Sequence, residues 1–190
     1  EAVTGWHAYQ YARGRLNILN EINAYLGTSY EDTKKKINNI DEALNNANKR
    51  IKDLEAKLVK NKILEESDIK YVPDFDIPYF TGIFPNVDMS VLRESTDIFK
   101  YRYTSGCVVL GSTDNNENPK LIIAITEDLV NKGLDANKMA KPLGKIIDGG
   151  GGGSATLAQA GGKDASKLNE VMDQVPKTIK RMLEEKKQQK

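Results

Sequence analysis

The sequence has little of the chemistry on which secreted proteins and many enzymes depend. Its 190 residues include one cysteine, one histidine and one tryptophan. The single cysteine, Cys107, excludes an intrachain disulfide, and the lone histidine, His7, has no second ligand at i+4 to make a zinc site. No apolar run approaches the roughly 18 residues of a membrane-spanning helix. These shortages argue against a disulfide-stapled, zinc-binding or membrane-spanning protein, and they suit a reducing compartment.

Recognisable catalytic motifs and a strong overall charge are also missing. The sequence contains neither a Walker loop nor a dinucleotide-binding fingerprint after a strand. The net charge is +1, from 28 basic and 27 acidic residues, so the overall balance does not indicate a nucleic-acid binder. The distribution is uneven, because residues 67–148 carry 9 basic and 12 acidic side chains and residues 149–190 carry 8 and 5. We therefore expect no catalytic site and no metal site, and we look for binding in the C-terminal part.

The first third of the sequence has the periodicity of two helices. Residues 5–26 carry an apolar stripe at spacings of three and four, and Gly27 is placed to end that helix. Residues 29–66 place apolar side chains at successive a and d positions of a heptad repeat. We expect an antiparallel coiled-coil hairpin over residues 5–66. The shorter helix can cover only half of the longer one, which leaves Ile51, Leu54 and Leu58 as candidate oligomerisation residues.

A change of composition after Ser67 marks the start of a globular domain. Residues 67–86 are rich in proline and aromatic side chains, and the pattern then alternates between strands and helices. We expect strands near residues 79–84, 106–111, 120–126 and 156–160. Helices are expected near 90–101, after Asp128, near 136–147, and beyond Asp164, where Pro176 should split or kink the last one.

The second and third of these strands lack the alternation of a solvent-facing strand, so we expect a hairpin in mid-sheet with both faces covered. The predicted fold class is α/β of the α+β type. It combines an antiparallel helical coiled-coil hairpin over residues 5–66 with a mixed-sheet globular domain over residues 67–190.

The most unusual stretch is a run of five glycines, Gly149 to Gly153, followed by Ser154, an apolar run and Gly161-Gly162. Ordering a glycine costs about 0.5–1 kcal/mol more than ordering an alanine in regular structure, so the run implies a need for bare backbone. One such need is to receive an anion on exposed N–H groups. A flexible linker is the alternative. The apolar strand and the helix start that follow favour a glycine loop within a folded domain.

This stretch carries a resemblance to a known family. The residues from Gly149 to Asp164 resemble the signature of the last domain of alanyl-tRNA synthetases, a DHHA1-type domain. Glu1-Ala2-Val3-Thr4-Gly5 resembles the segment where the editing domain of that family finishes and its C-terminal coiled coil begins. The resemblance implies that residues 1–4 end an editing-domain linker. It also implies that ATP and zinc belong to upstream domains, with no cofactor in this fragment.

The resemblance implies a binding function within an alanine–tRNA ligase of the cytoplasm. In that family this region holds the outer corner of tRNA(Ala), assists aminoacylation and editing, and in some members dimerises the enzyme. The expected partners are tRNA(Ala), the upstream editing and aminoacylation domains of the same chain and a second copy, with no membrane. The candidate RNA-binding residues are Gly149, Gly150, Gly151, Gly152, Gly153, Lys163, Lys177, Lys180 and Arg181.

Two other interpretations stay open. The first is the substrate-binding half of a DHH-family phosphoesterase. Many of those relatives have a histidine after the glycines, where this sequence has Ser154, and the Asp-His-His motif does not occur. The second is a structural coiled-coil oligomerisation module whose glycines serve only close packing.

Overall fold

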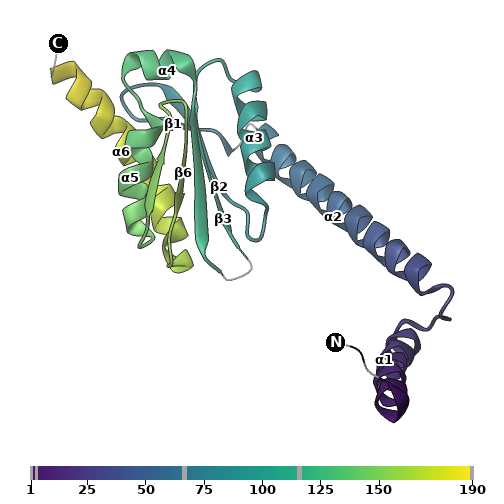
Figure 1. Cartoon of the computed structure of the whole chain (residues 1–190). Helices are drawn as coiled ribbons and strands as arrows, with labels where there is room; N and C mark the ends of the chain where they lie inside the picture. Colours follow the sequence, from purple (N-terminus) through teal and green to yellow (C-terminus); the bar gives the residue numbers. More distant parts are fainter. Residues whose placement is uncertain (1, 3, 66–67, 115–116, 189–190) are drawn as a thin grey trace. The chain divides into compact units, whose positions relative to one another are not determined.

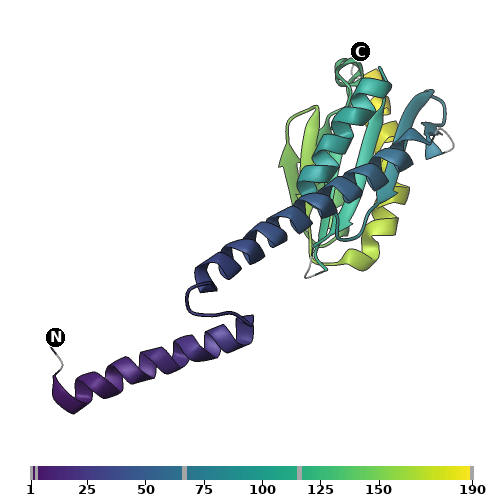
Figure 2. The same ribbon diagram turned by 90° about the vertical axis from the view of Figure 1, so that its right-hand side faces the viewer.

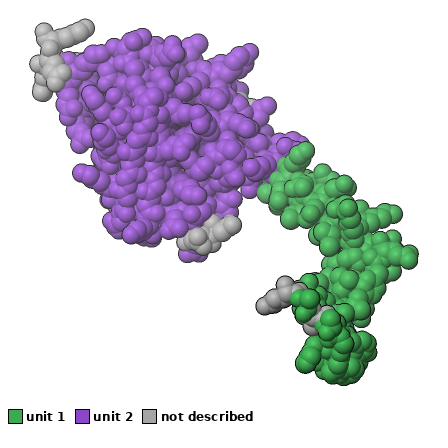
Figure 3. Space-filling view, in the orientation of Figure 1, with its two compact units in different colours: residues 1–51 green, residues 52–190 purple. Residues whose placement is uncertain are grey.

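The computed structural model describes residue 2 and residues 4–65, 68–114 and 117–188 (Figure 1). The chain divides into two compact units, which Figure 3 shows in different colours. Unit 1 comprises residues 1–51 and unit 2 comprises residues 52–190. The boundary falls inside a long helix, whereas the change of composition on which the sequence division rests lies after Ser67.

Unit 1 consists of helix α1 (Gly5–Leu26) and the first part of helix α2 (Thr33–Leu64). Gly27 ends α1 in the left-handed conformation, with φ 61°, as the sequence predicts. The connection is fixed by the Tyr30 hydroxyl, which donates to the carbonyl oxygen of Leu16 at 3.2 Å. The apolar stripes remain exposed, with exposed fractions of 53% for Leu16 and 43% for Ile37. Antiparallel pairing of the two helices therefore stays a prediction.

Unit 2 is built on a six-stranded mixed sheet with the order β1-β2-β3-β4-β6-β5. Strand β2 runs parallel to β3, and the other neighbouring pairs are antiparallel. The predicted central hairpin is confirmed, since β3 pairs with β4 and Val109 lies opposite Ile123. The strands are β1 (Lys70–Val72), β2 (Ile77–Ile83), β3 (Cys107–Thr113), β4 (Pro119–Ile125), β5 (Gly150–Gly153) and β6 (Leu157–Gly161).

Helices cover both faces of this sheet, as the unbroken apolar runs predict (Figures 1 and 2). Helices α5 (Ala136–Ile146) and α6 (Leu168–Gln188) lie on one face. Helix α3 (Met89–Arg102) and the C-terminal part of α2 lie on the other. Side chains alternate between the two cores along each strand, so Val109 contributes to the first core and Val108 to the second. Helix α4 (Glu127–Lys132) and a 3-10 turn (Ala165–Lys167) complete the unit.

Local capping signals place the helices of the first face. Asp135 caps α5 by accepting a hydrogen bond from the Lys138 N–H at 3.1 Å. Asp164 accepts from the Ser166 N–H at 3.0 Å and opens the turn before α6. Of the two effects expected of Pro176, a split of the last helix is wrong, because α6 runs through it without a break, and a kink stays a prediction. Burial of the apolar face of α6 outweighs the lost backbone hydrogen bond.

Helix α2 reaches unit 2 through its last turns. Val59 and Ile63 are fully buried in the core beneath α3. Leu58, one residue before Val59, has an exposed fraction of 59%, because adjacent residues point about 100° apart around a helix and Leu58 faces away from this core. The second half of α2 thus has a partner within the chain on one face and none among the described residues on the face of Leu58.

We expect Ile63→Ala to lower the free energy of unfolding by about 2–5 kcal/mol, because it empties a buried site. Leu58→Ala is the matched control on the exposed side of the same helix and should change it by no more than about 0.5 kcal/mol. Urea unfolding at low protein concentration measures both. Equal effects of the two substitutions would contradict the packing of α2 against unit 2.

Candidate nucleic-acid interface

The glycine run forms a strand at the edge of the sheet rather than the predicted loop. Strand β5 pairs with β6 in antiparallel register, with Gly150 opposite Gly161 and Gly153 opposite Ala158. Backbone groups on its inner edge are therefore occupied by the ladder, and those on its outer edge stay free of a further strand. The predicted surface position is nevertheless right, because Gly150, Gly152 and Gly153 are exposed.

On the face toward α5, the glycines are required by close packing. A Cβ added at Gly151 would lie 2.7 Å from the Ala160 Cβ and 2.8 Å from the Ala140 carbonyl oxygen. A Cβ added at Gly144, within α5, would lie 2.8 Å from the carbonyl carbon of Gly150. Helix and strand therefore touch backbone to backbone, which a larger residue at either position would prevent.

On the opposite face, the glycines have no such role. A Cβ at Gly150 would meet no atom of the described chain within 4 Å. At Gly152 it would approach the Asn137 Oδ1 at 3.6 Å, and at Gly161 the Pro119 carbonyl oxygen at 3.8 Å, both ordinary contact distances. None of the three has a positive φ. The fold itself therefore accepts a side chain at these positions, and glycine leaves them as bare backbone.

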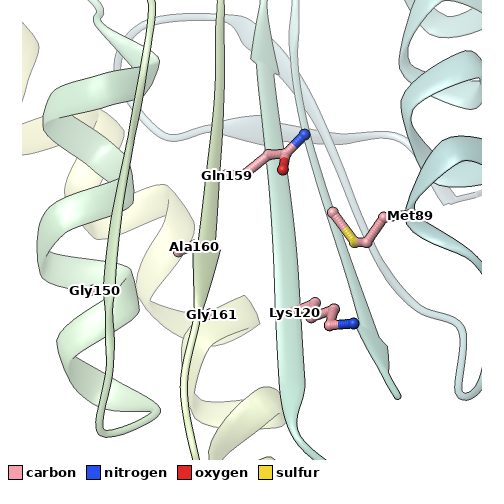
Figure 4. A pocket seen from close by; sticks show the side chains of 6 residues that line it. All are labelled: Met89, Lys120, Gly150, Gln159, Ala160 and Gly161. Atoms are coloured by element: carbon pink, nitrogen blue, oxygen red, sulfur yellow. The ribbon is translucent and has the colours of Figure 1, made fainter. Parts of the chain in front are cut away.

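This bare backbone borders a cavity of about 420 Å³ (Figure 4). Its lining residues come from α3, β4, β5 and β6, and they are Met89, Lys120, Gly150, Gln159, Ala160 and Gly161. Gln159 is exposed, and Lys120 forms an ion pair with Asp114 at 3.5 Å. We call the surface formed by Gly150, Gly152, Gly161 and Gln159 the open face. It combines a flat backbone with an amide and is bordered by a thioether and an ammonium group.

Of the basic residues that the sequence predicts for the site, the structure brings Lys163 to the glycine strand. Lys163 is exposed, and its N–H donates to the Ile147 carbonyl oxygen at 2.8 Å, just before the glycines. Beside it, Lys167 forms ion pairs with Asp148 at 3.1 Å and Asp164 at 3.3 Å. Hydrogen bonds to these two carboxylates raise the pKa of Lys167. The network joins Asp148, two residues before β5, to the Asp164 cap after β6.

The grouping of the other three predicted cations with the glycines is wrong. Lys180 forms an ion pair with Asp74 at 2.7 Å, in the turn between β1 and β2 at the far edge of the sheet. Arg181 pairs with Glu185 at 3.8 Å and lines a different cavity, on the α5 face. Lys177 is exposed on the same helix, one turn before Arg181. Helix α6 crosses the sheet away from β5, so nearness in sequence does not become nearness in space.

Sequence reasoning missed Met89, Lys120 and Gln159 as lining residues of the open-face cavity. They belong to three separate elements, and none sits in a motif. Their meeting depends on the sheet order, in which β6 returns beside β4, and no local pattern encodes that order.

The residues that line the open-face cavity include no histidine, cysteine, aspartate or glutamate. In the part of the chain that the structure describes, no cluster of His, Cys, Asp and Glu side chains could hold a metal ion. Cys107 is fully buried in β3, and burial raises the pKa of its thiol to about 12, which agrees with a core residue. Within the same residues no helix is long and apolar enough to cross a membrane.

Comparison with known proteins identifies the globular part. Residues 76–181, more than half of the chain, match the model of the DHHA1 domain.

The chain belongs to the DHHA1 family. It is 35% identical over 183 residues to an alanine–tRNA ligase of Acetivibrio thermocellus, which covers 96% of this chain and 21% of that protein. It is 32% identical over 184 residues to the alanine–tRNA ligase of Pelotomaculum thermopropionicum, with the same two coverages. The DHHA1 chain thus spans about a fifth of the length of these relatives.

A solved structure shares the fold. The C-Ala domain of Aquifex aeolicus alanyl-tRNA synthetase superposes with a TM-score of 0.53 at 27% identity, over 58% of this chain and 96% of that one. The resemblance that the glycine stretch carries is confirmed, and so is the predicted mixed-sheet α+β class of the globular domain. The helical hairpin stays a prediction.

The two faces of β5 make a paired prediction about stability. Gly151→Ala should lower the free energy of unfolding by about 1–3 kcal/mol, because its Cβ meets Ala160 and the α5 backbone. Gly150→Ala, one residue away, should leave it unchanged or raise it by up to about 1 kcal/mol, because it stiffens the unfolded chain. Thermal or urea unfolding distinguishes them. A destabilisation of similar size in both would show that the open face is also committed to packing.

Proposed function

We propose that this chain is the C-terminal tRNA-binding region of an alanine–tRNA ligase. In this proposal it holds the outer corner of tRNA(Ala) and thereby assists aminoacylation and editing by domains upstream in the same polypeptide. The observation that carries the proposal is the set of glycines at Gly150, Gly152 and Gly161, which the fold does not need; Gly150 and Gly161 line a cavity. Bare backbone at an exposed site serves an external partner that approaches closely.

The open face suits a folded RNA. Without Cβ atoms a flat base or base pair can lie against the β5–β6 backbone, and the Met89 thioether adds an apolar contact at its border. The Gln159 amide offers both a donor and an acceptor to a base or ribose edge. Lys120 lines the cavity and Lys163 is exposed after β6, so we assign the phosphate contacts to these two ammonium groups. The ion pair of Lys120 with Asp114 is partly exposed and therefore weak enough for a phosphate to replace it.

The phosphoesterase alternative is less well supported. The residues that line the open-face cavity include no carboxylate and no imidazole that would act as a general acid or base. Ser154, which stands where many such relatives have a histidine, has a local structural role. Its hydroxyl accepts a hydrogen bond from the Leu157 N–H at 3.1 Å and closes the turn between β5 and β6.

The purely structural alternative explains three of the five glycines in the run. Close packing accounts for Gly149, Gly151 and Gly153, and for Gly144 in α5, because an added Cβ at each would lie within 3 Å of atoms of another segment. It gives no reason for Gly150, Gly152 or Gly161. A binding surface accounts for both sets, because the first set holds the strand in place and the second leaves it bare.

The test of tRNA binding compares two RNAs. A tRNA(Ala) transcript should bind the 190-residue chain more tightly than a hairpin of the acceptor stem, which lacks the outer corner. Gly150→Val with Gly152→Val should raise the dissociation constant for tRNA by about tenfold or more and remove this difference, because the valines hold the RNA away from the backbone. Circular dichroism checks that the variant folds. A folded variant with unchanged preference for tRNA would exclude the open face as the contact.

Dimerisation through α2 is the second part of the proposed function. Ile51, Leu54 and Leu58 have exposed fractions of 52%, 56% and 59% and occupy successive a and d positions. A second copy of the helix would bury them in a coiled-coil seam. The occupant is a second copy of this chain because the heptad spacing on the helix is the pattern of a self-complementary seam.

Sedimentation tests this seam. The unmodified chain should form a dimer at concentrations of tens of micromolar, and L54K/L58K should raise the dissociation constant of the dimer by more than about tenfold, because charges enter an apolar seam. The control N46K/D53N makes the same change of net charge at positions beside the seam. Monomeric behaviour of the unmodified chain over a wide concentration range would refute dimerisation.

A further inference from the structure

The outer face of helix α5 carries a line of lysines. Lys138, Lys141 and Lys145 are exposed and lie at i, i+3 and i+7, so they share one side of the helix. With a rise of 1.5 Å per residue, the line is about 10 Å long. The 11 residues of α5 include no aspartate or glutamate to offset it.

These lysines are left uncompensated by the rest of the fold. Among the described residues none of the three forms an ion pair or a side-chain hydrogen bond. Six other lysines of unit 2 form ion pairs, namely Lys52, Lys62, Lys120, Lys132, Lys167 and Lys180. The α5 lysines differ from the remaining unpaired ones in lying as a row of three on one side of a helix that has no acidic residue. Like charges at i and i+4 cost a few tenths of a kcal/mol in a helix, so Lys141 and Lys145 slightly destabilise α5. An unpaired line of this kind is suited to an anionic partner.

A cavity adjoins this line of lysines at the N-terminal end of α5, beside Lys138. This cavity, of about 310 Å³, is lined by Gly133, Lys138, Arg181, Met182, Glu185 and Lys186. It holds three cationic side chains against one carboxylate. Lys186 is fixed there by donating a hydrogen bond to the Asn131 carbonyl oxygen at 2.6 Å, and Arg181 lies 3.8 Å from Glu185. Lys138 belongs to both the line and the cavity, so the two form one continuous basic surface.

We propose that this surface, comprising Lys138, Lys141, Lys145 and Arg181, is a second RNA contact that binds the phosphate backbone. It rests on the proposed tRNA-binding function and adds a site on the other side of the sheet from the open face. A line about 10 Å long is long enough to face successive phosphates of one RNA strand. Point charges in a row, without an apolar pocket between them, contact a backbone without reading sequence.

The position of β5 makes the two contacts compatible. Because β5 is the edge strand, with α5 on one side and the open face on the other, an RNA that reaches around this edge touches both surfaces. The open face would fix the corner of the RNA, and the α5 surface would hold a neighbouring stretch of backbone.

The test is the salt dependence of tRNA(Ala) binding for two triple variants of the 190-residue chain. K138Q/K141Q/K145Q should lower the slope of log affinity against log salt by about 2–3 units, at 0.7–0.9 for each lost phosphate contact. The control K57Q/K60Q/K70Q removes three other exposed lysines of unit 2 that form no ion pair among the described residues. It should change the slope by less than about half a unit.

The possible outcomes separate this surface from the proposed function. If the unmodified chain binds tRNA and the open-face valines weaken it, but the α5 variant behaves like the control, the second contact is refuted and the function stands. If both triple variants lower the slope equally, the change in slope reflects only the lower net charge of the protein, and the proposal also fails. If the α5 variant loses binding to a poly-glutamate peptide but not to tRNA, the surface serves an acidic protein and the proposal is overturned. Absence of any tRNA binding by the unmodified chain refutes the function itself.

Discussion

The backbone contact between α5 and β5 is the constraint on which the interface depends. Gly144 and Gly151 let helix and strand approach so closely that a Cβ on either would lie within 3 Å of the other element. This contact holds a strand of four glycines, which has almost no intrinsic preference for extended structure, at the edge of the sheet. It also fixes which side of β5 stays bare and which side of α5 faces outward with its lysines.

The rest of unit 2 supplies rigidity to that edge. The β3–β4 hairpin is buried on both sides. Strand β6 pairs with β4 on one side and with β5 on the other, so its hydrogen bonds hold β5 against this buried hairpin. The ion pairs of Lys167 with Asp148 and Asp164 tie together the segments that enter β5 and leave β6. Flat recognition of an RNA needs such a preformed surface, because ordering a free glycine loop on binding would cost backbone entropy at each residue. In a strand this backbone entropy has already been lost when the protein folds.

Local signals predicted much of the fold. The Gly27 helix end, the Asp135 cap and the central hairpin each follow from a short pattern, and the structure contains them. The prediction that the glycine run forms a loop was wrong. A strand of glycines has no side chains whose alternation could reveal it in the sequence. The positive net charge of residues 149–190 was the reason for predicting Lys180 and Arg181 as site residues, although both lie on α6 away from β5. The α5 lysines were missed because acidic residues around them gave residues 67–148 a net negative charge.

The most direct test of the open face is site-specific cross-linking from Gly150→Cys. Cys107, the one native cysteine, is buried with a raised thiol pKa of about 12, so the new thiol alone would take up a photoreactive label in the folded chain. We predict cross-links to the outer-corner nucleotides of tRNA(Ala), and none from Tyr71→Cys, which lies on the opposite edge strand β1. Equal cross-linking from both positions, or none from Gly150→Cys with a labelled and folded chain, would contradict the assignment of the open face as the RNA contact.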